Sequence, residues 1–61
     1  MVIEDLNDVF VEPQLQEIEI YSLDKNKTVY TGPLDQADEF FDEEVATIDN
    51  LNGGFVLTIN I

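Results

Sequence analysis

Two stretches of the chain alternate between apolar and polar residues, and this alternation limits the fold more than any other feature. In 15–23, LQEIEIYSL, Ile18 and Ile20 alternate with glutamates. In 55–61, FVLTINI, every second residue from Phe55 onward is a large apolar one. A period of two is typical of a strand that buries one face, because successive side chains point to opposite sides. We therefore expect a strand at each place.

Turn-forming residues divide the chain into two hairpins. The segment 24–27, DKNK, contains Asp and Asn, which tolerate the left-handed backbone of tight turns. The β-branched and aromatic residues of 28–31, TVYT, are then expected to return as a second strand. A third strand is expected at 45–49, VATID, and the turn at 50–54, NLNGG, leads into the last strand.

Between the hairpins the apolar period becomes that of a helix. Leu34, Ala37 and either Phe40 or Phe41 recur at i, i+3 and i+6 or i+7, which makes a one-sided apolar stripe. The sequence therefore predicts an α+β fold in the order β-β-α-β-β, with a small antiparallel sheet packed on one short helix. The expected core contains Ile18, Ile20, Val29, Leu34, Phe40 or Phe41, Val45, Ile48, Phe55, Leu57 and Ile59.

The N-terminal residues have no clear period. The segment 4–8, EDLND, is acidic and turn-like, 9–11, VFV, allows a short strand, and Pro13 interrupts what precedes it. We expect a single domain over 1–61, in which residues 1–14 are flexible or loosely docked. A chain of 61 residues lies near the lower limit for folding without disulfides or metal.

The last strand is apolar on both faces. An exposed edge of such a strand invites pairing with another chain. The strand is therefore either central in the sheet or part of a homo-oligomer interface, and the sequence leaves both arrangements open.

Charge and missing residue types exclude several functions. Fourteen Asp and Glu residues face two lysines, so the net charge is −12. Nucleic acids and anionic membranes would be repelled, because binding them requires Lys or Arg to displace counterions. The chain has no Cys and no His, which excludes disulfides and Cys/His zinc sites. It shows no signal-peptide pattern and no apolar run near the ~20 residues of a membrane span, so we expect an intracellular protein.

Patterns for catalysis and metal binding are incomplete. The segment 24–35, DKNKTVYTGPLD, resembles a calcium loop but has Val29 in place of the turn glycine and Asp35 in place of the final Glu. The carboxylate pairs at i, i+4 lack a cleft that would exclude water, and no nucleophile lies in a recognisable motif. We expect no enzymatic activity, no cofactor and no metal.

The segment 35–44, DQADEFFDEE, concentrates six acids and contains no lysine, so the usual i, i+4 salt bridges are missing. On a helix about 15 Å long, their spacing would approach that of the charges along duplex DNA, one per ~1.7 Å. Phe40 and Phe41 cannot both point inward on one helix, so one is free to serve as an exposed anchor. The segment is either a solvated face that maintains solubility or a surface for a basic partner. The candidate partner-binding residues are Asp35, Asp38, Glu39, Phe41, Asp42, Glu43 and Glu44.

The stretch Tyr21–Ile61 resembles small uncharacterised proteins encoded by phages and prophages of Firmicutes. The resemblance rests on the pieces VYTG, PLDQADEFFDEEV and TID and on the last apolar strand. It implies a phage accessory or host-interaction protein in the cytoplasm of a bacterial cell, with no known activity. Its size and charge are also similar to those of phage DNA mimics that inhibit nucleases, restriction enzymes and uracil-DNA glycosylases, although no motif of those families is present.

Three hypotheses follow. The first is a non-catalytic module whose acidic face binds a host or phage protein with a basic surface. The second is a DNA mimic that blocks the basic groove of a host nucleic-acid-binding enzyme. The third is a structural role, in which the C-terminal strand assembles a homo-oligomer or docks into a phage particle.

Overall fold

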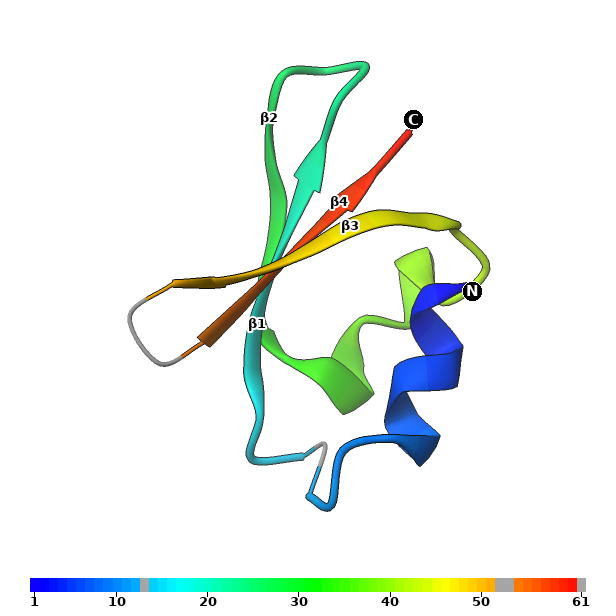
Figure 1. Cartoon of the computed structure of the whole chain (residues 1–61), viewed down its shortest axis with the longest axis vertical. Helices are drawn as coiled ribbons and strands as arrows, with labels where there is room; N and C mark the ends of the chain where they lie inside the picture. Colours follow the sequence, from blue (N-terminus) through cyan, green and yellow to red (C-terminus); the bar gives the residue numbers. More distant parts are fainter. Residues whose placement is uncertain (13, 52–53, 61) are drawn as a thin grey trace.

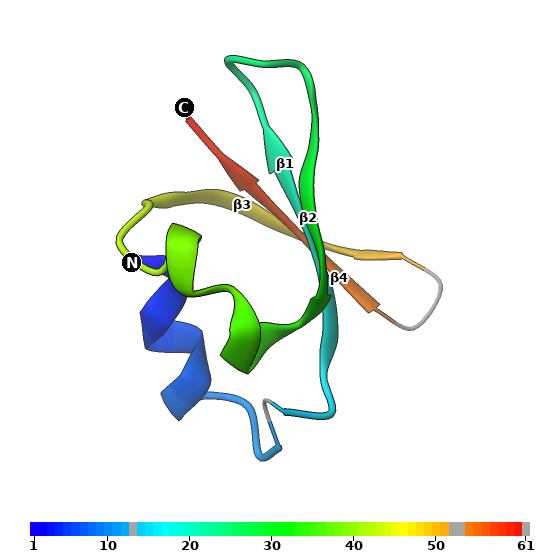
Figure 2. The same cartoon turned by 180° about the vertical axis from the view of Figure 1, so that it is seen from behind.

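The computed structural model describes residues 1–12, 14–51 and 54–60, which form one four-stranded sheet and short 3-10 helices (Figure 1). In chain order the elements are η1 (Ile3–Asp8), β1 (Glu17–Ser22), β2 (Lys27–Pro33), η2 (Leu34–Gln36), η3 (Asp38–Phe40), β3 (Val45–Leu51) and β4 (Gly54–Ile59). The view from behind shows that the helical turns lie together on one side of the sheet (Figure 2). None of the described helices is long and apolar enough to cross a bilayer.

The two predicted hairpins are present, but the sheet is mixed. The strand order is β2-β1-β4-β3, with antiparallel pairs within each hairpin and a parallel pair, β1 and β4, in the centre. The prediction of a wholly antiparallel sheet is therefore wrong. The link from β2 to β3 runs from one edge strand to the other, and it covers one face of the sheet on the way (Figure 1).

The C-terminal strand lies inside the sheet. β4 pairs with β1 on one side and with β3 on the other, so both of its edges are occupied. This is the first of the two arrangements expected from its apolar faces. Self-assembly through this strand would have to displace a neighbour, so the hypothesis of a homo-oligomer built on it is not supported by the pairing. Pro13, residues 52–53 of the predicted turn and Ile61 lie outside the described residues.

The expected helix between the hairpins does not form. Two single 3-10 turns, η2 and η3, occupy its place, and Ala37 between them has φ −86° and ψ 41°, outside the helical range. The order is therefore η-β-β-η-η-β-β and not β-β-α-β-β. Like charges at i, i+4 oppose a regular helix here, and no basic residue lies in the last turn of η2 or η3 to complement a helix dipole.

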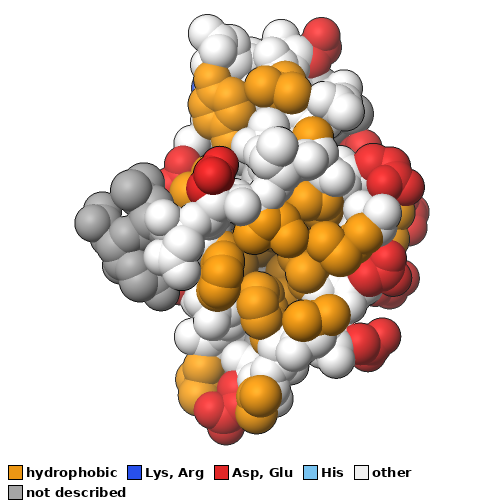
Figure 3. Space-filling view, in the orientation of Figure 1, with side chains coloured by type: hydrophobic (Ala, Val, Ile, Leu, Met, Phe, Trp, Pro, Cys, Tyr) orange, Lys and Arg blue, Asp and Glu red, His pale blue; other side chains and the backbone are white. Residues whose placement is uncertain are grey.

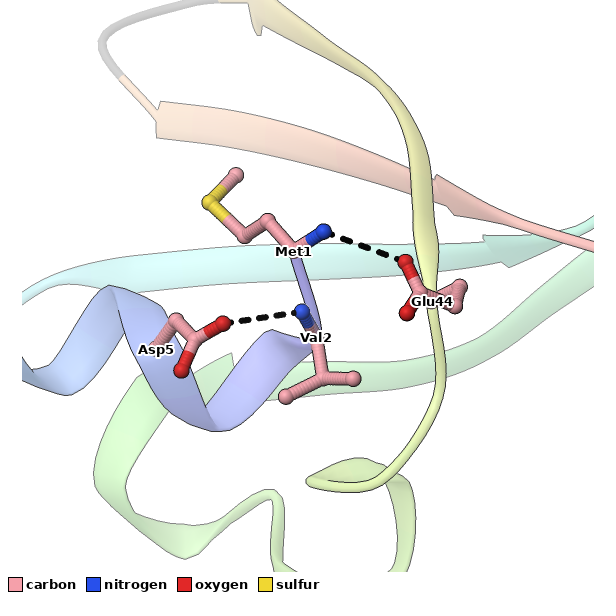
Figure 4. Close-up of polar contacts among 4 residues, drawn as sticks. All are labelled: Met1, Val2, Asp5 and Glu44. Carbon is pink, nitrogen blue, oxygen red and sulfur yellow. Dashed lines mark hydrogen bonds and ion pairs between the residues drawn. The ribbon is translucent and has the colours of Figure 1, made fainter.

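The N-terminal segment forms η1 and enters the core. Ile3 and Leu6 are 0% and 3% exposed, which is not the packing of a loosely docked segment. The backbone N–H of Val2 donates to Oδ2 of Asp5 at 3.1 Å (Figure 4). This bond satisfies one of the donors that the start of a helix leaves free.

Backbone hydrogen bonds tie the start of the chain to the link that precedes β3. The N–H of Ile3 donates to the carbonyl oxygen of Glu43 at 3.0 Å, and the N–H of Val45 donates to that of Met1 at 2.9 Å. The short strand that the sequence allows at 9–11 does not form, and these residues instead leave η1 as a turn and a bend. The N-terminal segment thus fixes one end of the link.

The core lies between the sheet and the helical turns. Its fully buried apolar side chains are Ile3, Leu6, Ile18, Ile20, Leu34, Ala37, Leu57 and Ile59. Half-buried side chains packed against them are Phe10, Val29, Tyr30, Phe40, Phe41, Val45 and Phe55. The inward face of each central strand was thus predicted correctly, whereas the contribution of η1 was missed.

Ile48 was wrongly assigned to the core. It pairs in register with Leu57, which is fully buried, yet Ile48 itself is 42% exposed. The pairing of β3 with β4 shifts between Val45 and Thr47. As a result, Val45 lies opposite Ile59 and Ile48 lies opposite Leu57, so both are on the core side of the sheet. Ile48 stays exposed because β3 is an edge strand whose middle the helical turns do not cover.

Candidate functional site

Residues 35–44 form the acidic segment, which belongs to the link that follows β2 and precedes β3 in the chain. The segment lies at the surface. Asp35, Asp38, Glu39 and Asp42 are exposed, as is Glu44, whereas Glu43 is half-buried. In the described part of the chain the only ion pair joins the Met1 ammonium to Oε2 of Glu44 at 3.1 Å (Figure 4). The other carboxylates of the segment therefore have no ion-pair partner among the described residues.

The positive side chains lie elsewhere in the fold. Lys25 belongs to the turn between β1 and β2, and Lys27 is the first residue of β2. The acidic segment follows the opposite end of β2, after Pro33. Both lysines therefore lie at the end of β2 away from the acidic segment.

Neither phenylalanine of the segment is the exposed anchor that helical geometry predicted. Phe40 and Phe41 are both half-buried, and both pack against the core. The rule that only one can face inward applies to a regular helix, and the break at Ala37 removes that constraint. The backbone carbonyl of Phe41 also accepts a hydrogen bond from the N–H of Glu4 at 3.1 Å. Phe41 therefore helps to hold the segment against η1.

The even ladder of charges is also absent. Its spacing presupposed one helix through 35–44, and the structure has two three-residue turns followed by an irregular link. The candidate residues are brought to one segment of the surface, but not in the regular series that resembled a DNA backbone.

Sequence reasoning missed a pocket beside the acidic segment. It has a volume of about 300 Å³ and is lined by Val29, Tyr30, Gln36, Ala37, Asp38, Glu39 and Phe40. β2 supplies one wall, and η2, Ala37 and η3 supply the other. The pocket combines aromatic and aliphatic surface with two carboxylates. This lining suits the binding of a group that is partly apolar and partly positive.

Tyr30 is held in a fixed position in this pocket. Its ring lies 6.2 Å from that of Phe40, with an interplanar angle of 53°. Its hydroxyl donates a hydrogen bond to the carbonyl oxygen of Pro33 at 2.6 Å. Gly32 permits this approach, because it has φ 149° and a Cβ there would lie 3.0 Å from the Tyr30 oxygen. The rings of Tyr30 and Phe40 form the aromatic wall of the pocket. Local backbone geometry thus fixes the position of Tyr30 in this wall before any ligand binds.

The negative field of the segment reaches Tyr30. Burial, and then the charges of Asp35, Asp38 and Glu17, raise the pKa of the Tyr30 phenol above its ordinary value of 10.0. Tyr30 therefore stays protonated and keeps its donor function at neutral pH. The same carboxylates would favour a positive group placed at this site.

We expect the stability of the protein to fall above about pH 10 partly through Tyr30. Because the native state binds this proton more tightly than the unfolded chain, the contribution is complete below the unfolded pKa and is lost as the pH rises through the native pKa. Urea unfolding between about pH 9 and 11 should show a steeper decline for the native sequence than for Tyr30→Phe. Tyr30→Phe also loses the hydrogen bond to Pro33, which lowers its free energy of unfolding by the same amount at every pH. Equal slopes of the free energy of unfolding against pH in the two proteins would therefore contradict the prediction.

A second surface feature is apolar. Figure 3 shows hydrophobic side chains over the middle of one face, with Asp and Glu side chains along its margin near the helical turns. The exposed large apolar side chains include Met1, Val9 and Ile48. The ring centroids of Phe10 and Phe55 lie 5.1 Å apart, which connects the end of η1 to β4.

No protein-family model, no curated protein and no solved structure matches the chain.

Proposed function

We propose that the protein is a non-catalytic interaction module that binds a protein partner with a basic surface. The observation that carries the proposal is the acidic segment, whose exposed carboxylates Asp35, Asp38, Glu39 and Asp42 form no ion pair within the described residues. The resemblance to phage and prophage proteins supports an accessory role in the cytoplasm of a bacterial cell. The partner is then a host or phage protein.

Electrostatics favours this kind of partner. A net charge of −12 on a 61-residue chain attracts basic surfaces and repels acidic ones. The attraction acts over about 8 Å at physiological ionic strength and weakens as salt rises. Single exposed ion pairs contribute little, with a median of ~0–1 kcal/mol. Affinity must therefore come from several carboxylates acting together with a contact that excludes water.

The two other hypotheses have less structural support. Mimicry of DNA was inferred from a regular helix carrying evenly spaced charges, and the segment forms no such helix. Assembly through the C-terminal strand required a free edge, and β4 is paired on both sides. The interaction module depends on neither feature.

The proposal is tested by neutralising the acidic segment. We expect Asp35→Asn, Asp38→Asn, Glu39→Gln and Asp42→Asn together to abolish retention of a basic protein from a Firmicute lysate. The reason is that these are the unpaired exposed carboxylates of the segment. The measurement is a pull-down with the tagged protein at low and high salt, with mass spectrometry of the retained proteins.

A matched control separates local from total charge. Asp8→Asn, Glu12→Gln, Asp24→Asn and Asp49→Asn together remove the same number of charges from exposed residues outside the segment. The control variant should still retain the partner at low salt and release it at high salt. Equal loss from both variants would mean that only net charge matters, and a salt-resistant partner kept by both would contradict the proposal.

A further inference from the structure

We infer that the pocket between β2 and the acidic segment receives an arginine side chain of the partner. The inference rests on the proposed function and specifies its central contact. An exposed acidic surface alone does not select one partner, because its ion pairs are individually weak. The pocket adds a hollow of about 300 Å³ directly beside the carboxylates. This is the small end of the range of ~300–1,000 Å³ for ligand pockets, so it suits a single side chain.

The apolar part of the pocket matches the stem of a long basic side chain. Val29, Ala37 and the rings of Tyr30 and Phe40 form this part. Arginine and lysine both bury their methylene groups against apolar surface while the charged head stays near polar groups. An acidic or neutral polar side chain would lack the complementary charge, and a purely apolar one would leave the carboxylates without a partner.

The charged part of the pocket matches a cation at its rim. Asp38 and Glu39 line the pocket and are exposed, and Gln36 adds a neutral acceptor. The charges of Asp35 and Asp38 also raise the pKa of the Tyr30 phenol, so their negative potential extends to the aromatic wall. A cation there is attracted by carboxylates on η3 and by the negative faces of the rings.

Arginine fits this combination better than lysine. Its guanidinium is planar, is more weakly hydrated than an ammonium, stacks on aromatic rings and bonds carboxylates through two N–H groups at once. The hydrogen bond from Tyr30 to Pro33 and the contact between Tyr30 and Phe40 fix the aromatic wall before binding. Less conformational entropy is then lost when the arginine enters.

The first test uses the arginine side chain itself as the probe. The ¹⁵N-labelled protein is titrated with a capped Gly-Arg-Gly peptide at low salt, to about 20 mM because one side chain supports only millimolar affinity. We expect saturating chemical-shift changes at the amides of residues 29–30 and 36–40. Capped Gly-Lys-Gly should bind the same amides about two- to fivefold more weakly. Shifts spread evenly over all acidic residues, or equal binding of both peptides, would overturn the inference.

Two matched variants test the aromatic wall. Phe40→Leu removes a ring that lines the pocket, whereas Phe10→Leu removes a half-buried, core-packed ring that does not and that lies outside the acidic segment. Phe40→Leu should weaken the binding of Gly-Arg-Gly about two- to fivefold, and Phe10→Leu should leave its affinity unchanged. A dispersed amide spectrum establishes that each variant is folded. Equal effects of both variants would overturn the inference.

The pull-down distinguishes this inference from the function on which it rests. If neutralising the acidic segment releases the partner but Phe40→Leu does not, the interaction module stands and the arginine pocket is wrong. If neither change affects the retained proteins, the proposed function fails, and any binding of Gly-Arg-Gly is then unrelated to a partner.

Discussion

Replacing Leu57 with alanine is expected to lower the free energy of unfolding by about 2–5 kcal/mol. Leu57 lies on the central strand β4 and is fully buried, so its truncation leaves a cavity that the surrounding strands cannot fill. A domain of this size is stabilised by only about 3–5 kcal/mol, so a loss of this size removes much or all of its stability. Urea unfolding followed by circular dichroism measures the loss.

The matched control is Ile48→Ala. Ile48 pairs in register with Leu57 and faces the same side of the sheet, but it is 42% exposed on the edge strand β3. Its truncation should lower the free energy of unfolding by less than about 1 kcal/mol, because much of the side chain is already exposed to water and little buried apolar area is lost. A loss for Ile48→Ala as large as that for Leu57→Ala would show that another chain or segment covers β3 in solution.

The strands could be predicted because their signal is local. The alternation at Ile18 and Ile20, and again at Leu57 and Ile59, appears in consecutive residues and specifies which face is buried. Their pairing could not be predicted in the same way. The parallel neighbours Ile20 and Leu57 are distant in the chain, and their register depends on how the link crosses the sheet.

For the link from β2 to β3, the sequence predicted which residues are buried but not the conformation of the backbone. Leu34 and Ala37 lie in the core, as the helical stripe required. The spacing of the charges, however, was calculated for a regular helix, and the backbone at Ala37 interrupts it. The stripe predicted which residues are buried, but repulsion between acids without basic partners opposed the regular helix.

The pocket could not be seen in the sequence because it depends on a register shift. Ile20 pairs with Tyr30, and Tyr21 pairs with Thr28, so Val29 is an extra residue in β2. The shift places Tyr30 on the core face, where its ring meets that of Phe40. A short β-branched and aromatic run such as 28–31 predicts a strand, but not where that strand bulges.

Ile3→Ala should be as damaging as a substitution in the central strands, with an expected loss of about 2–5 kcal/mol in the free energy of unfolding. Ile3 is fully buried, and its N–H donates to Glu43, next to the last acid of the segment. The variant should therefore also release that end of the acidic segment, which amide hydrogen exchange at position 3 and at Val45 would report as faster exchange.

The control for the N-terminal segment is Val11→Ala. Val11 is 97% exposed, so its truncation should change stability by no more than about 0.5 kcal/mol. If Ile3→Ala were equally mild, residues 1–8 would not be part of the cooperative fold in solution, and the acidic segment would lose the backbone bonds that fix it. If Ile3→Ala is severe, η1 is as much a part of the core as β1 and β4. The shape of the proposed binding surface then depends on residues that have no recognisable pattern in the sequence.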